Sequence, residues 1–291
     1  MANPLQKILP KRFRSDDTVI PVVRLSGAIM TSQSALRPTL SLATAAPVLQ
    51  KAFDYKKAPA VAIVVNSPGG SPVQSRLIHQ RIRDLAEEKG KRVLVFVEDV
   101  AASGGYMIAC AGDEIIADPS SIVGSIGVVS GSFGFVEAIA KLGIERRVHT
   151  AGTSKATLDP FQPEKAEDVE HLKALQREVH QTFIDLVKNS RGNRLVEDDD
   201  LFSGLFWSGL RGRDLGLVDQ IGDLRGTLRA RFGDKVKPVL IQASRSLFGR
   251  KQPGIRADMV AGAGLASIGA GFASEILSTA EERALWARFG L

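Results

Sequence analysis

Positions 60–97 read AVAIVVNSPGGSPVQSRLIHQRIRDLAEEKGKRVLVFV, in which two short apolar runs enclose an amphipathic stretch. Both runs are rich in Val and have the length of buried strands. Between them Ser71, with Gln74 three residues later, predicts a helix that begins with a capping box, and Gly90 predicts where it ends. A strand, a helix and a strand in this order form a βαβ unit, so we expect an α/β fold with a mostly parallel sheet.

Further elements are expected on both sides of this unit. A long amphipathic pattern with acidic residues in its first turns predicts a helix at about 164–190. Short apolar runs predict buried strands at 19–25, 60–65, 92–97, 114–117 and 239–242.

The composition is that of a globular protein. The chain has 291 residues, of which 44% are hydrophobic and 24% charged. We expect a basic N-terminal segment at 1–16, one α/β domain at 17–243, and a linker with an Ala/Gly-rich helical tail at 244–291. The single cysteine, Cys110, can form neither an intramolecular disulfide nor a thiolate metal site, so nothing indicates an oxidising compartment.

Charge and hydropathy bear on location and partners. The net charge of +6 is too small and diffuse to indicate a nucleic acid or membrane partner by itself. No signal peptide is evident, and the weakly polar stretch at 259–274 is short of the ~20 residues that a membrane span needs. We therefore expect a cytoplasmic chain that binds no nucleic acid. The tail is expected to pack on the body or a neighbouring subunit, with peripheral contact at the inner membrane as the alternative.

Metal and nucleotide chemistry find little support in the sequence. The four histidines show no metal-ligand spacing, and the glycine-bearing turns do not match the phosphate-binding motifs, so we expect no metal and no cofactor. His149 precedes a loop of small residues at 150–154 and is kept as a residue that could line a site.

Two glycine-bearing turns follow neighbouring predicted strands. The first, at 66–71, reads NSPGGS, and the second, at 99–106, reads DVAASGGY. The first can be a simple tight turn, or it can present backbone N–H groups to a ligand at the carboxyl ends of the strands. In the second, Ser103 is either the N-cap of an apolar helix or an accessible nucleophile among small residues.

A serine nucleophile needs a base, and Lys155 is a candidate. It lies in the small-residue sequence AGTSKAT at 151–157, with no acidic residue within three positions. To act as a base, its pKa would have to fall by about three units, which corresponds to roughly 4 kcal/mol of desolvation. Spacing alone does not distinguish such a base from a solvent-exposed lysine.

The chain resembles the signal peptide peptidase A family of serine peptidases. The resemblance covers roughly 17–243 and follows the family's order. It rests on the following motifs: NSPGG at 66–70, ASGGY at 102–106, GSIGV at 124–128, GI at 143–144, the Lys155 loop with DPF at 159–161, and GLVD at 216–219. The resemblance implies a fold of the Clp-protease/crotonase type, a spiral of β-β-α units around a mostly parallel sheet.

The resemblance also implies roles for individual residues. Ser103 is implied as the nucleophile and Lys155 as the general base, with an oxyanion hole formed by Gly69 or Gly70 together with Gly104. The implied function is a serine endopeptidase that cleaves signal-peptide remnants, or other unfolded or membrane-released peptides, through an acyl-enzyme. Because neighbouring subunits complete each site in that family, a homo-oligomer is expected.

Two other functions remain open. The crotonase-type fold also serves acyl-CoA hydratases and hydrolases, although these ordinarily have acidic groups near the second turn. A non-catalytic oligomeric scaffold at the membrane surface, with Lys155 merely exposed, is the second alternative.

Overall fold

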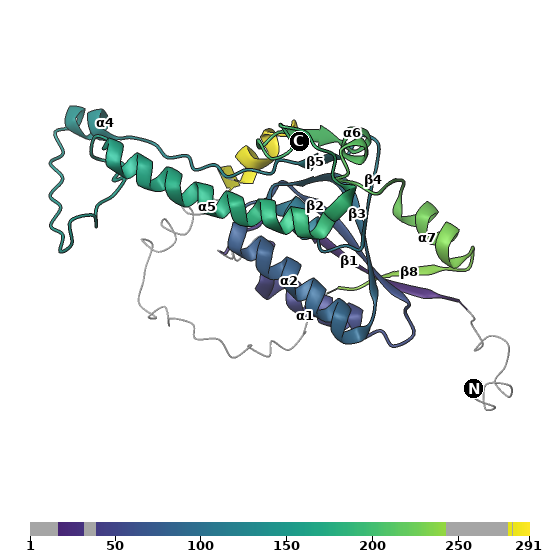
Figure 1. Ribbon diagram of the computed structural model, residues 1–291. Helices are drawn as coiled ribbons and strands as arrows, with labels where there is room; N and C mark the ends of the chain where they lie inside the picture. The colour runs from purple at the N-terminus through teal and green to yellow at the C-terminus, as the bar shows by residue number, and fades with distance from the viewer. Residues whose placement is uncertain (1–16, 32–38, 243–278, 281) are drawn as a thin grey trace, which may run out of the picture.

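Eight strands form one sheet in the computed structural model, which describes residues 17–31, 39–242, 279–280 and 282–291 (Figure 1). The strands are β1 (Val19–Ser26), β2 (Ala60–Ser67), β3 (Arg92–Ala102), β4 (Glu114–Ala117), β5 (Ile122–Gly124), β6 (Phe206–Ser208), β7 (Gln220–Ile221) and β8 (Lys237–Leu240). Their order is β6-β5-β3-β2-β1-β8, and β4 pairs with β3 and β7. All pairs are parallel except β5 with β6. The predicted α/β class with a mostly parallel sheet is confirmed.

The helices numbered α1 to α7 accompany the sheet in the described residues. They are α1 (Leu42–Phe53), α2 (Pro72–Lys89), α3 (Gly104–Ala109), α4 (Val136–Lys141), α5 (Ala166–Arg191), α6 (Gly209–Asp214) and α7 (Leu224–Phe232). The helix expected after Ser71 is α2, and it ends where predicted, with Gly90 in the left-handed region. The reciprocal capping box was wrong. The Gln74 side chain accepts a hydrogen bond from the Leu42 N–H at 2.9 Å and so joins α2 to the start of α1.

The sheet is covered differently on its two faces. Every residue of β2 is buried, so its side chains alternate between two apolar layers. On one face Val61, Ile63 and Val65 belong to a large core together with residues of α1, α2, α3 and the second half of α5. On the other face β2 contributes to a smaller core that α7 covers through Leu228.

β3 changes its neighbour partway along its length. Residues 94–97 pair with β4, whereas residues 100–102 pair with β5. The Asn66 side chain supports the change, because it donates to Asp99 at 2.7 Å and accepts from the Val100 N–H at 3.2 Å. This pairing carries β3 five residues beyond the predicted end at 97 and brings it directly to Ser103.

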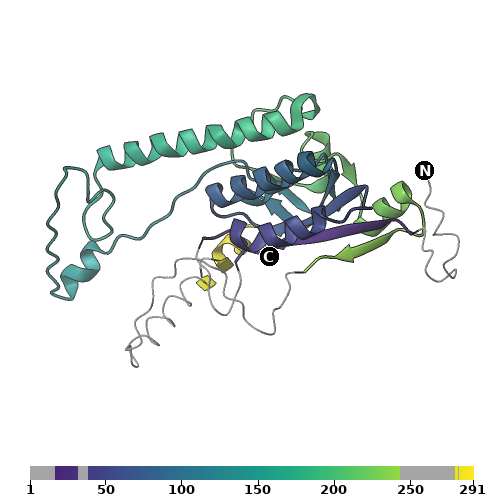
Figure 2. The ribbon, with the colours of Figure 1, turned by 90° about the horizontal axis from the view of Figure 1, so that it is seen from below.

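A segment that we call the arm, residues 128–165 with α4, extends away from the sheet together with the first half of α5 (Figures 1 and 2). Several of its apolar side chains are exposed, with 80% of Phe133 and 73% of Leu142 accessible. Within the arm, Arg146 forms an ion pair with Asp159 and lies 4.8 Å from the centre of the Phe161 ring.

The expected apolar face of α5 is buried only near its end. Phe183 and Val187 are buried in the core, whereas Val169 and Leu172, in the half that accompanies the arm, are partly exposed. The helix therefore has the apolar face that the sequence pattern predicts, but the rest of the chain buries only the part of that face near Phe183 and Val187.

The two ends of the chain lie largely outside the described residues, including the whole of 1–16 and most of the tail at 244–291. The described part of the tail packs on the body, where Phe289 contacts the buried residues Val100 and Ala102. No helix in the described parts of the chain is long and apolar enough to cross a membrane.

Candidate active site

Ser103 lies at the junction of β3 and α3, in a backbone conformation that L-residues rarely adopt. Its φ is 52° and its ψ is −122°. Its N–H donates to the Gly124 carbonyl at 2.8 Å, which ties the junction to the end of β5. The Ser103 hydroxyl makes no hydrogen bond to the described residues, and it does not cap α3. The structure therefore does not support the simple N-cap interpretation of this serine.

The two glycine-bearing turns are in direct contact. A Cβ atom placed on Gly69 would lie 2.8 Å from the Ser103 Cβ and 2.9 Å from the Gly104 nitrogen. Gly69 also has a φ of 101°, so both the space and the backbone conformation require glycine. The structure thus brings together Ser103 and the three glycines expected around it.

Backbone N–H groups are available next to the serine. Within the described residues, the N–H groups of Gly70 and Gly104 have no hydrogen-bond partner. The Gly69 N–H donates to the Ser67 hydroxyl at 3.3 Å. Of the two glycines that the sequence left open for an oxyanion hole, Gly70 is therefore the one with a free donor.

A pocket of about 520 Å³ opens at Ser103. Most of the described residues that line it are Gly, Pro, Ser and Val, and none of them is acidic. The pocket also contains four polar side chains that the sequence analysis did not place at the site: Ser125, His180, Ser203 and Arg288.

Ser125 and His180 come from different elements and meet at this pocket. Ser125, which follows β5, is buried and has a φ of 52°. The His180 Nε2 lies 2.9 Å from the Ile126 carbonyl and must donate to it, so the Nδ1 atom is left as an acceptor. His180 precedes the buried Phe183 by three residues, and this spacing was a signal that it faces the core.

Lys155 and His149 do not line this pocket. Both are exposed and lie in the arm, which extends away from the sheet in both views of the molecule (Figures 1 and 2). One chain therefore does not bring Lys155 to Ser103. His79 lies in a separate cavity between α2 and α5, where burial lowers its pKa to about 4.

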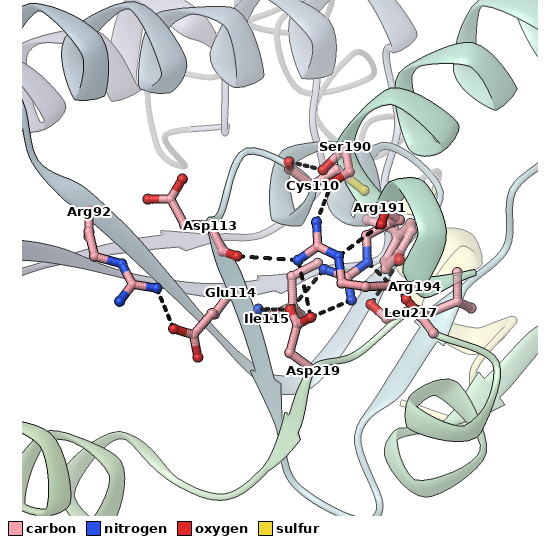
Figure 3. Close-up of polar contacts among 12 residues, drawn as sticks. Arg92, Cys110, Asp113, Glu114, Ile115, Ser190, Arg191, Arg194, Leu217 and Asp219 are labelled. Carbon is pink, nitrogen blue, oxygen red and sulfur yellow. Dashed lines mark hydrogen bonds and ion pairs between the residues drawn. The ribbon is translucent and has the colours of Figure 1, made fainter. Parts of the chain in front are cut away.

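A buried polar network lies behind α3 (Figure 3). Arg191, at the end of α5, is 1% exposed and donates to both carboxylate oxygens of Asp219 at 2.8 Å. Its Nε donates to the Gly216 carbonyl at 2.9 Å. The Tyr106 hydroxyl of α3 donates to the neighbouring Leu217 carbonyl at 2.8 Å. These bonds join α3, α5 and the 216–219 segment into one unit.

The network holds its charges in ionised form. Burial opposes the ionisation of Asp219, but hydrogen bonds from Arg191 and from the Ile115 N–H outweigh it and lower the pKa of this carboxyl group. The GLVD motif at 216–219 thus has a structural role, because it joins α5 to α3, the helix that begins directly after Ser103.

A model of peptidase family S49 matches residues 86–237, which include the Ser103 turn, the arm and the GLVD motif. A putative protease of Methanocaldococcus jannaschii is 35% identical over 58% of this chain and 54% of its own length. The chloroplastic serine protease SPPA of Arabidopsis thaliana is 31% identical over 78% of this chain and 34% of its own length.

A longer relative carries a different name. A Brucella abortus protein named Na(+)/H(+) antiporter NhaA is 64% identical over 99% of this chain. The chain spans 39% of that protein's length, and the matching part includes the residues that fit the peptidase model.

Proposed function

The chain belongs to peptidase family S49, and we propose that it is a serine endopeptidase with Ser103 as its nucleophile. One observation carries the proposal: the Ser103 hydroxyl lies in a pocket beside the N–H groups of Gly70 and Gly104, and none of these three groups has a hydrogen-bond partner in the described part of the chain. A peptide carbonyl in this pocket can be attacked by the serine while two backbone donors bind its oxygen.

The proposed reaction is acyl transfer in two steps. A base takes the Ser103 proton, the serine oxygen attacks the peptide carbonyl, and the N–H groups of Gly70 and Gly104 stabilise the resulting oxyanion. The protonated base then gives its proton to the leaving amine. Water, activated by the same base, finally hydrolyses the acyl-enzyme and restores the serine.

We propose that the base is Lys155 of a neighbouring protomer in a homo-oligomer. The arm that carries Lys155 extends from the body and exposes apolar side chains such as Phe133 and Leu142, which a second copy would cover. No lysine lines the Ser103 pocket within the described residues. Burial of the Lys155 ammonium group against a neighbour would favour its neutral, proton-accepting form.

His180 is the second candidate for the base, because it lies in the Ser103 pocket of the same chain. Its Nε2 is held by the Ile126 carbonyl, so Nδ1 would take the proton. This assignment requires no neighbour.

A mixing experiment separates the two assignments. Ser103→Ala, Lys155→Ala and His180→Ala are each assayed on casein, after light scattering has shown that they assemble like the wild type. We expect the first two to lose at least about 1,000-fold in activity. If Lys155 acts on a neighbour, co-refolding these two inactive variants restores activity, because some sites combine an intact serine with an intact lysine.

The outcomes assign the base directly. Activity that survives in Lys155→Ala and disappears in His180→Ala would move the role to His180. Inactivity of every protein, wild type included, despite normal assembly would favour the non-catalytic scaffold. Casein cleavage tests only the general peptidase activity. The substrates that we propose for this chain are signal-peptide remnants and other unfolded or membrane-released peptides.

A further inference from the structure

The pocket at Ser103 contains one permanently charged side chain among the described residues that line it. That side chain is Arg288, which belongs to the C-terminal segment and lines the pocket together with Leu285. Arg288 forms no ion pair and no hydrogen bond with the described residues. Since no acidic residue among the described ones lines the pocket, the guanidinium group has no carboxylate partner from that part of the chain.

Arg288 is exposed, and its place in the chain is set by the packing of Phe289, the residue that follows it. Phe289 is 8% exposed and packs against Val100 and Ala102, the last residue of β3 before Ser103. The Phe289 ring also meets the Phe206 ring edge to face, with ring centres 5.1 Å apart. The segment that carries Arg288 therefore packs against β3, the strand that ends directly before Ser103.

We propose that Arg288 forms a subsite for a carboxylate group of the bound peptide, close to the bond that is cut. The proposal rests on the peptidase function proposed above. A guanidinium group presents several N–H donors in one plane and pairs with a carboxylate through two parallel hydrogen bonds. The carboxylate belongs either to an acidic side chain of the substrate or to its free C-terminus.

Peptide binding tests the subsite without cleavage. The probes are a series of fluorescein-labelled ten-residue peptides of Ala, Val and Leu. Each peptide has one Glu, and its position differs from peptide to peptide, from four residues before to four residues after the central bond. Matched peptides carry Gln or Lys instead of Glu, and a second pair compares a free with an amidated C-terminus. Affinities are measured by fluorescence anisotropy on Ser103→Ala, and kcat/KM on the enzyme with an intact serine.

We expect about a tenfold preference for the carboxylate peptide at one or two positions, or for the free C-terminus. Arg288→Gln should abolish this preference, and Arg288→Glu should reverse it in favour of a Lys peptide. Arg283→Glu is the matched control. It makes the same charge change in the same segment at an exposed residue that does not line the pocket, and it should keep the wild-type preference.

Each outcome has one meaning. Equal binding of all peptide pairs, or a preference that survives in Arg288→Glu, overturns the subsite. A preference lost in Arg283→Glu as well as in Arg288→Glu reflects the overall charge of the segment and also overturns it. If the carboxylate preference depends on Arg288 but no peptide is cleaved, the subsite stands and the peptidase proposal fails.

Discussion

The Ser103 turn packs closely against the rest of the chain, whereas the arm that carries Lys155 leaves much of its surface exposed. Ser103 is flanked by buried residues, and glycines without room for a Cβ atom lie directly against it. Lys155 is exposed, and so are large apolar side chains of its arm such as Phe133 and Leu142. The chain thus completes the surroundings of the proposed nucleophile but not those of the proposed base.

Because of this difference, substitutions in the two regions should affect different properties of the protein. Changes around Ser103 remove contacts that the folded chain makes with itself, so they should lower the free energy of unfolding. Changes on the outer surface of the arm remove no such contacts, so they should act only through assembly and activity. Three substitutions, from the largest expected effect to the smallest, test this separation.

Arg191→Met should cost about 3–5 kcal/mol of unfolding free energy, because it removes the buried guanidinium group that donates to both Asp219 oxygens and leaves this carboxylate only the exposed Arg194, at 3.2 Å. Denaturation in urea measures the change. The double variant Arg191→Met with Asp219→Asn removes both charges and should recover part of the loss. A loss below about 1 kcal/mol in the single variant would show that the body does not depend on this pair.

Gly69→Ala should lower stability by about 1–3 kcal/mol and greatly reduce peptidase activity, because its Cβ would collide with Ser103 at the site itself. Gly90→Ala is the matched control. Gly90 also has a positive φ, of 60°, but a Cβ there meets no atom of the described residues within 4 Å. It should cost about 1 kcal/mol and leave activity unchanged. Thermal unfolding and casein cleavage are measured for both, and equal activities in the two variants would contradict the assigned geometry.

The double variant Phe133→Ser with Leu142→Ser should change the unfolding free energy of the body by less than about 0.5 kcal/mol, since both side chains are exposed. Assembly, measured by sedimentation, should weaken, and activity should fall with it. An unfolding midpoint that drops as far as that of Gly69→Ala would mean that the arm is part of the core.

The sequence predicted the parts of the fold that rest on local patterns. The strands at 19–25 and 114–117 and the helix between Ser71 and Gly90 needed only hydrophobic periodicity and end signals. The extension of β3 to residue 102 was missed because it depends on pairing with β5, and the polar residues Glu98 and Asp99 interrupt the apolar run. Only the fold shows that the Asn66 side chain joins the two strands there.

The candidate site divides in the same way. Ser103 and its glycines stand out because strand-to-helix turns have recognisable sequences, and the contact between the two turns followed from a parallel sheet. Arg288 lies 185 residues after Ser103 in the chain and reaches the pocket only through the packing of Phe289. No local pattern predicts such a contact. The role of Lys155 remains a proposal, because one chain leaves this residue in the arm.

The separation of Ser103 from Lys155 has a consequence for the time between synthesis and assembly. Under the proposed mechanism, a newly made chain at low concentration would fold with its nucleophile in place and would still be unable to cut. Specific activity would then rise with protein concentration until the assembly is saturated. The enzyme would thus need no propeptide to protect other nascent chains, because at low concentration it would not assemble and would stay inactive.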